Sequence, residues 1–163
     1  MRKLLVALLL VPSIGVCKAK TAPTKPVEPT AIGIVYRLDP TSQELKRLPD
    51  EQWKKNYRFS VTVNFEDVEV KGVSSTFRIK ASESIEFIFK TGSPEKVSLY
   101  RFVQKGKRRY FDVGQGSKPI KGLSIEVSQF GASSYKLVPI SPLTPGEYAI
   151  IIADELYTFG VDQ

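Results

Sequence analysis

The chain has 163 residues, of which 42% are hydrophobic and 25% are charged, so one folded domain is expected and a disordered or fibrous chain is excluded. Its formal net charge of +7 does not by itself indicate a nucleic-acid partner. The sequence contains no histidine, which excludes a Ser-His-Asp triad, a Cys-His pair and the usual catalytic zinc site.

Residues 1–19 have the order of a secretory signal peptide. Arg2 and Lys3 form a positive start, residues 4–11 are an unbroken apolar run, and Pro12, Ser13 and Gly15 follow. The apolar run is too short for a membrane span, which needs roughly 20 residues. We therefore expect residues 1–19 to be removed and the rest to be exported, as a periplasmic or secreted protein.

Cys17 leaves two outcomes of processing open. Residues 14–17 read Ile-Gly-Val-Cys and resemble the bacterial lipoprotein signal Leu-Ala-Gly-Cys, but they depart from it at Val16, where a small residue is expected. In one outcome Cys17 is lipidated and anchors the protein to a membrane. In the other, cleavage occurs near Cys17 or Ala19, and a mature chain without cysteine has no disulfide or thiol chemistry.

Residues 20–30, KTAPTKPVEPT, are rich in Pro, Thr and Lys, which is typical of an extended, solvated tether. Beyond them, apolar and polar residues alternate in short runs between turn-forming residues. These runs predict strands at 32–36, 59–65, 77–80, 84–90, 97–103, 110–113, 123–128, 135–140, 148–152 and 156–161.

The strand spacing predicts one antiparallel β-sandwich over residues 31–163. Only residues 50–57 could form a helical turn. Val68 and Val70 fall out of phase with the alternation at 59–65, so a bend, bulge or turn is expected at Glu66–Asp67. Trp53, the only tryptophan, is expected to cover one end of the core.

Residues 143–148 read Leu-Thr-Pro-Gly-Glu-Tyr and lie between two expected strands. They resemble the Leu-x-Pro-Gly-x-x-Tyr corner of fibronectin type III domains, although Tyr148 comes one residue sooner. The resemblance implies an immunoglobulin-like sandwich, in which the ring of Tyr148 packs inside and its hydroxyl bonds to the backbone a few residues upstream. Because residues 148–152 are apolar on both faces, this strand is expected to be central.

Most of residues 31–163 also resembles a group of uncharacterised exported bacterial proteins. The similar stretches are Gly-Ile-Val-Tyr-Arg-Leu-Asp at 33–39, Leu-Tyr-Arg-Phe at 99–102 with a Lys-Gly-Lys-Arg turn, the corner at 143–148, and Phe-Gly-Val-Asp at 159–162. This resemblance implies a small envelope-associated β domain and supplies neither an activity nor site residues.

A basic cluster at residues 105–110, Lys-Gly-Lys-Arg-Arg-Tyr, is the first candidate site. The candidate binding patch consists of Arg101, Lys105, Lys107, Arg108, Arg109 and Tyr110. Four cations on an expected hairpin tip could hold an anionic surface or an acidic protein face outside the cytoplasm. The alternative is an exposed hairpin whose cations only keep it soluble. Export argues against nucleic acid.

The acidic residues Glu66, Asp67 and Glu69 are the second candidate site, with Asp154 and Glu155 as a further pair. Two carboxylates held ~5–9 Å apart across a cleft could hydrolyse a glycosidic bond. The alternative is that these acids lie in solvated turns. Neither stretch has the ligand spacing of a calcium loop.

The sequence thus predicts a non-catalytic, exported binding or structural module of the bacterial cell envelope, with no cofactor and no metal. Its expected partner is an envelope protein or an anionic surface, and it would touch a membrane only through a lipid on Cys17. Two alternatives stay open. One is a carboxylate-based hydrolase of cell-wall glycans, and the other is a secreted inhibitor or chaperone-like subunit that works by strand addition.

Overall fold

The computed structural model describes residues 27–59 and 64–163. The signal peptide expected at 1–19, with Cys17, and residues 20–26 of the tether lie outside the described residues. Regular structure in the described part consists of strands and one 3₁₀ turn, η1 (Pro94–Lys96). None of it is a helix long and apolar enough to cross a membrane.

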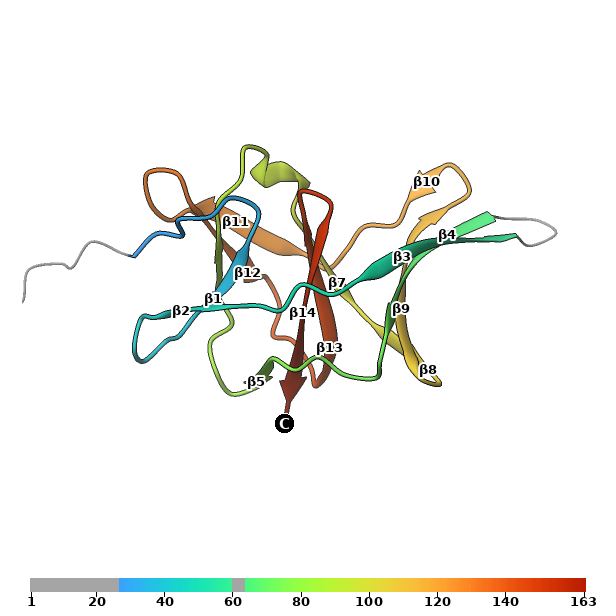
Figure 1. Ribbon diagram of the computed structural model, residues 1–163, viewed down its shortest axis with the longest axis horizontal. Coiled ribbons are helices and arrows are strands. Elements are labelled where there is room, and N and C mark those ends of the chain that lie inside the picture. The colour runs from blue at the N-terminus through green and yellow to red at the C-terminus, as the bar shows by residue number, and fades with distance from the viewer. Residues whose placement is uncertain (1–26, 60–63) are drawn as a thin grey trace, which may run out of the picture.

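The strands form three sheets (Figure 1). Sheet I has the order β11 (Ile125–Gln129), β12 (Tyr135–Pro139), β6 (Phe87–Phe89), β1 (Val35–Leu38), β2 (Leu45–Arg47). Sheet II has the order β5 (Arg78–Lys80), β14 (Glu155–Asp162), β13 (Gly146–Ile152), β7 (Ser98–Arg101). Sheet III has the order β10 (Lys118–Pro119), β9 (Arg108–Gln115), β4 (Asn64–Lys71), β3 (Trp53–Phe59), and β8 (Val103–Lys105) also pairs with β9. These pairs are antiparallel, except that β5 runs parallel to β14.

Sheets I and II pack face to face through the larger hydrophobic core. Phe87 of β6 contacts Phe159 of β14, with ring centroids 4.8 Å apart, and Tyr148 of β13 stacks on the same Phe159 ring at 5.4 Å. Phe89 of β6 and Ile150 of β13 are also fully buried in this core. The apolar faces predicted from the alternation in these strands therefore meet as expected.

Sheet II buries its second face against sheet III. Ala149 of β13 and Leu156 of β14 join Val68 of β4 and Phe111 of β9 in a second core. Trp53 is partly buried against it, as expected for a residue that covers one end of a core. Sheet II is thus the middle layer of three, which explains why both faces of residues 148–152 are apolar. The predicted all-β sandwich is confirmed, and a third layer extends it.

The corner at residues 143–148 holds one end of β13. The Tyr148 side chain is 1% exposed, and its hydroxyl donates a hydrogen bond of 2.6 Å to the carbonyl oxygen of Thr144. This is the contact expected from the sequence: the ring is inside, and the hydroxyl bonds to the backbone four residues upstream.

Two local predictions were wrong. Residues 50–57 form no helical turn, because β3 pairs with β4 in continuous register from Trp53 opposite Val70 to Phe59 opposite Asn64. The alternation at 59–65 is not one strand either. Phe59 ends β3 and Asn64 begins its partner β4, while residues 60–63 lie outside the described residues. Every other expected strand overlaps a strand of the structure.

The irregularity expected at Glu66–Asp67 is confirmed as a β-bulge. Glu66 lies opposite Gly114 of β9, but Asp67 lies opposite Asp112, so Val113 has no opposing residue in β4. After this register shift, Asp67 and Glu69 share one face of sheet III, while Val68 lies on the other face, in the second core.

The described end of the tether contacts the folded domain. Glu28 accepts hydrogen bonds from the backbone amides of Ala132 and Ser133, at 2.9 and 3.1 Å, and from the hydroxyl of Ser134 at 2.9 Å. These three donors belong to the loop between β11 and β12. The carboxylate of Glu28 thus fixes this part of the tether to sheet I.

We expect Tyr148→Phe to lower the free energy of unfolding by about 1–3 kcal/mol, because it leaves the Thr144 carbonyl without its buried donor. The matched control is Tyr135→Phe. Tyr135 also stacks on a core phenylalanine, Phe89, but its hydroxyl has no hydrogen bond among the described residues. Urea unfolding of both variants measures the difference. Equal and small losses would contradict a stabilising role for the corner.

Candidate functional site

The basic cluster forms a tight hairpin tip, as the sequence predicts. Strands β8 and β9 are joined by two residues, Gly106 and Lys107, and Lys105 lies opposite Arg108. Gly106 has φ +60°, a left-handed conformation that suits glycine in a two-residue hairpin turn. Lys105 and Lys107 are exposed, and neither makes an ion pair with any residue in the described ranges.

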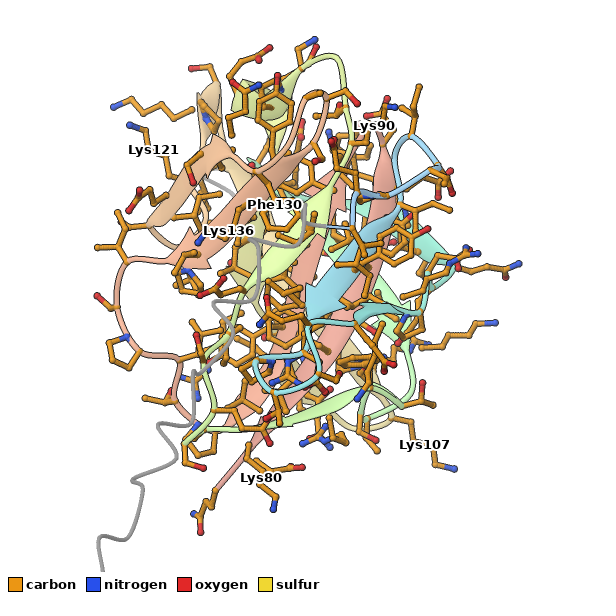
Figure 2. The ribbon with its side chains drawn as sticks, turned by 90° about the vertical axis from the view of Figure 1, so that its left-hand side faces the viewer. Lys80, Lys90, Lys107, Lys121, Phe130 and Lys136 are labelled. Carbon is orange, nitrogen blue, oxygen red and sulfur yellow. The ribbon has the colours of Figure 1, made fainter. Side chains whose placement is uncertain are left out.

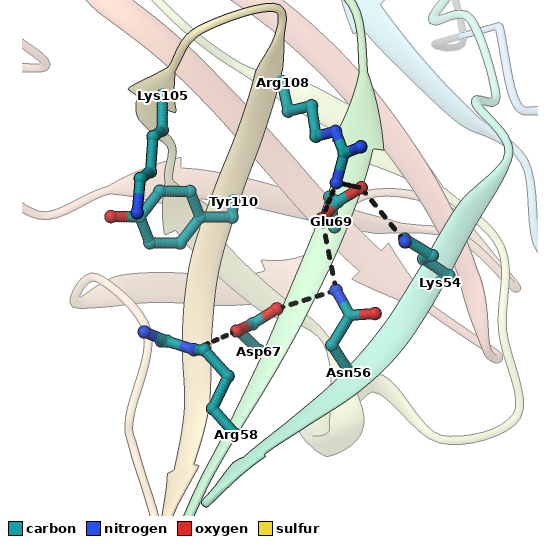
Figure 3. A pocket seen from close by; sticks show the side chains of 8 residues that line it. All are labelled: Lys54, Asn56, Arg58, Asp67, Glu69, Lys105, Arg108 and Tyr110. Carbon is teal, nitrogen blue, oxygen red and sulfur yellow. Dashed lines mark hydrogen bonds and ion pairs between the residues drawn. The ribbon is translucent and has the colours of Figure 1, made fainter. Parts of the chain in front are cut away.

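One face of sheet III is hollowed beside this hairpin (Figure 3). Side chains alternate between the two faces of a strand, so polar residues from four strands meet here, while Val68 of β4 and Phe111 of β9 point into the second core. We call this cavity of about 500 Å³ the hollow. It is lined by Lys54, Asn56 and Arg58 of β3, Asp67 and Glu69 of β4, Lys105 of β8, and Arg108 and Tyr110 of β9.

Two carboxylates in the hollow are surrounded by donors (Figure 3). Asp67 accepts hydrogen bonds from Arg58 Nε and, at 3.0 Å, from Asn56 Nδ2. Glu69 accepts from the same amide nitrogen at 3.3 Å and pairs with Lys54 at 3.3 Å and Arg108 at 3.2 Å. With four cations and two carboxylates among its lining residues, the hollow has an excess of positive charge.

The pKa of Glu69 is set by opposing effects. Desolvation raises it, but the hydrogen bond from Lys54 and the charges of Arg108 and Lys54 outweigh desolvation, so the pKa lies below the ordinary value of 4.5. A general acid in glycoside hydrolysis needs a raised pKa. Glu69 therefore lacks the raised pKa that the general acid of the hydrolase alternative requires.

The other acidic candidates do not join these two carboxylates. Glu66 lies on the opposite face of β4, where it pairs with Lys55 at 2.6 Å. Asp154 has φ +64° and lies in the turn between β13 and β14, as expected for a turn acid, and Glu155 is exposed at the start of β14. The acids at 66–69 are in a strand, not in the turn that the sequence allowed.

Arg109 does not belong to the exposed patch, and its assignment to the patch was wrong. Its side chain is 1% exposed and lies on the opposite face of β9 from Arg108. It pairs with Glu51 at 2.6 Å and with Glu147 at 3.3 Å, and it donates to the carbonyl oxygen of Gly72. The alternation of side chains along a strand separates the two neighbouring arginines.

Arg109 is the buried member of an ion network that we call the interlayer cluster: Glu51, Arg78, Arg109 and Glu147. Glu147 of β13 also pairs with Arg78 of β5 and accepts a hydrogen bond of 2.6 Å from the backbone amide of Ser75. The cluster links β9 of sheet III to two strands of sheet II, so it connects two layers of the fold.

Arg101 also lies outside the hollow. It belongs to β7 in sheet II, where its guanidinium donates a hydrogen bond of 3.0 Å to the carbonyl oxygen of Pro145 and lies 5.9 Å from the ring centroid of Tyr148. Arg101 thus supports the corner. Of the predicted patch, the structure brings Lys105, Arg108 and Tyr110 into the hollow and leaves Lys107 at the tip beside it.

Sequence reasoning missed Lys54, Asn56 and Arg58 of the hollow. Lys54 and Asn56 lie in the stretch 50–57, where the sequence allows a helical turn, and Arg58 follows it. The spacing of the three residues, with one residue between each pair, fits one face of a strand equally well. The described residues 27–59 and 64–163 contain no group of three or more acidic, Cys or His side chains that could hold a metal ion.

Comparisons of the chain with protein-family models, with curated proteins and with solved structures found no match.

Replacing Arg109 should be far more costly than replacing its neighbour. Arg109→Met leaves Glu51 and Glu147 without their buried cation, so we expect the free energy of unfolding to fall by about 3–5 kcal/mol. Arg108→Met removes an exposed arginine whose partner Glu69 keeps its ion pair with Lys54, so it should cost less than about 1 kcal/mol. Chemical unfolding of the two variants measures the contrast. Similar losses for both would contradict the burial of Arg109.

The lowered pKa of Glu69 makes stability depend on acid pH. A carboxylate whose pKa is lower in the folded state stabilises the protein above its unfolded pKa, near 4.5, and this stabilisation is lost as the pH falls. We expect Glu69→Gln to lose less stability than the wild type between about pH 5 and pH 3. Glu126→Gln, at an exposed carboxylate without an ion pair among the described residues, is the control. Parallel curves for wild type and Glu69→Gln would refute the expectation.

Proposed function

We propose that this chain is a non-catalytic, exported binding module of the bacterial cell envelope, and that the hairpin tip and the hollow form its contact surface for an anionic partner. The observation that carries the proposal is the pair of exposed lysines, Lys105 and Lys107, without an ion pair in the described part of the chain, next to a hollow with excess positive charge. Unneutralised cations of this kind attract and hold anionic groups.

The rigidity of the surface supports a binding role. The hollow is built on paired strands whose other face is packed in the second core, and Arg109 fixes β9 from behind. The backbone of such a support keeps its position without a partner, so little backbone conformational entropy is lost when one binds.

Sequence features support the cellular context of the proposal. The signal-peptide pattern at residues 1–19 supports export, with lipid anchoring at Cys17 as one form of it. The Tyr148 corner supports an immunoglobulin-like arrangement, which is common among extracellular binding domains. An exported protein with a basic surface meets acidic envelope components first.

The proposal is tested by photo-cross-linking in the native host. A photoreactive amino acid replaces Val103, which is 53% exposed and lies opposite Tyr110 in β8, so the cross-linker does not depend on lysine chemistry. The test variant is Lys105→Ser with Lys107→Ser. Arg109 is kept because its loss is expected to destabilise the fold.

The matched control is Lys80→Ser with Lys121→Ser, which removes the same charge at two exposed lysines. Figure 2 shows Lys80, Lys107 and Lys121 projecting from separate parts of the surface. We expect one envelope component to be captured by the wild type and the control and lost in the hairpin variant. Capture that is equal in all three proteins, or absent from all, would contradict the proposed contact surface.

A further inference from the structure

We infer that the ligand of the hollow is an acidic saccharide, a chain of sugar rings that carry carboxylate groups. This inference rests on the proposed function and adds the chemical class of the partner. It follows from the mixture of charges in the hollow, from the groups left free there and from the size of the space.

The charges of the hollow do not suit a dense polyanion. Asp67 and Glu69 lie among the lining residues, and hydrogen bonds from Asn56 hold both carboxyl groups in place. Phosphate groups packed against these carboxylates would be repelled at short range. A ligand that fits must bring hydrogen-bond donors to the carboxylates and negative charge to the cations around them.

Sugar hydroxyls supply the donors that this arrangement requires. A carboxylate has about four acceptor positions, and Asp67 accepts two hydrogen bonds from the described residues, from Arg58 and Asn56. Asn56 donates its amide nitrogen to the two carboxylates, which leaves its amide oxygen as a further acceptor for a hydroxyl. Hydroxyls both donate and accept, so they match a surface that offers both.

The cations of the hollow would recognise the negative charge of the saccharide. Lys105 Nζ has no ion pair among the described residues, and the hydroxyl of Tyr110 has no hydrogen bond there. Both groups come from the paired strands β8 and β9 and line the same hollow (Figure 3). A sugar carboxylate placed at this side would form a charge-assisted hydrogen bond with Lys105 and could accept one from Tyr110.

The volume of about 500 Å³ lies in the range of small-ligand sites and has room for roughly two sugar rings. A longer acidic saccharide presents the same units as a short fragment. We therefore expect binding to a polymer as well as to short fragments.

Three polymers separate the contributions of charge and of hydroxyl groups. Polygalacturonate carries both carboxylates and hydroxyls, its carboxyl-reduced form carries hydroxyls without charge, and polyphosphate carries charge without sugar rings. The exported protein, purified from the cells that process it, is titrated with each polymer at about 0.15 M salt, where long-range charge effects are screened. We expect polygalacturonate to bind at least about ten-fold more tightly than either of the others, the ratio expected for one or two charged hydrogen bonds.

Single substitutions test whether polygalacturonate binds in the hollow. Asn56→Ala and Lys105→Ser should each weaken polygalacturonate binding about five-fold or more. Tyr110→Phe removes only a hydroxyl and should weaken binding without loss of the fold. Lys80→Ser, on β5, should leave the affinity unchanged. Thermal unfolding of each variant checks that the fold is retained. If Asn56→Ala or Lys105→Ser is unfolded, the affinity of Tyr110→Phe decides whether the polymer binds in the hollow.

The outcomes distinguish this inference from the proposed function. Polyphosphate binding as tight as polygalacturonate binding would overturn the inference and leave an unspecific anionic contact surface. Absence of binding to all three polymers, with a cross-link at Val103 that still depends on the hairpin lysines, would also overturn the inference but leave the proposed function standing. Absence of polymer binding together with a cross-link independent of these lysines would overturn both.

Discussion

The arrangement of the layers depends on Arg109, a buried cation held by Glu51 and Glu147. A charge removed from water is tolerated only when it is paired and hydrogen-bonded, so these contacts fix the position of β9 against sheet II. The next residue on either side, Arg108 or Tyr110, points to the opposite face and lines the hollow. One face of β9 is therefore anchored by Arg109, and the other face carries residues that line the hollow.

Much of the fold could be predicted because its signals are local. The apolar faces of residues 148–152 predicted a central strand, and the corner at 143–148 predicted the hydrogen bond of Tyr148. The third sheet could not be predicted in the same way. The local pattern of β3 fits a strand or a helical turn, and its extended form depends on pairing with β4, in a register that begins at Trp53 opposite Val70.

The site, like the fold, could be predicted only where its signals are local in the sequence. The hairpin at Gly106 is a two-residue turn between neighbouring strands, so the sequence contains all of it. The burial of Arg109 depends on its ion pairs with Glu51 and Glu147, which lie 58 and 38 residues away along the chain. Asn56 likewise lines the hollow only because β3 pairs with β4, which brings it to Asp67. Contacts between distant residues decided which cations are exposed and which are buried.

The central claim is that the hollow and the hairpin bind one acidic ligand together. The most direct measurement is an NMR titration of the ¹⁵N-labelled exported protein with a short oligogalacturonate. We expect the side-chain amide of Asn56 and the backbone amides of residues 105–110 to shift together, with one common dissociation constant. Shifts centred on another surface, such as the exposed Ile140, or an unchanged Asn56 amide at saturation, would contradict it.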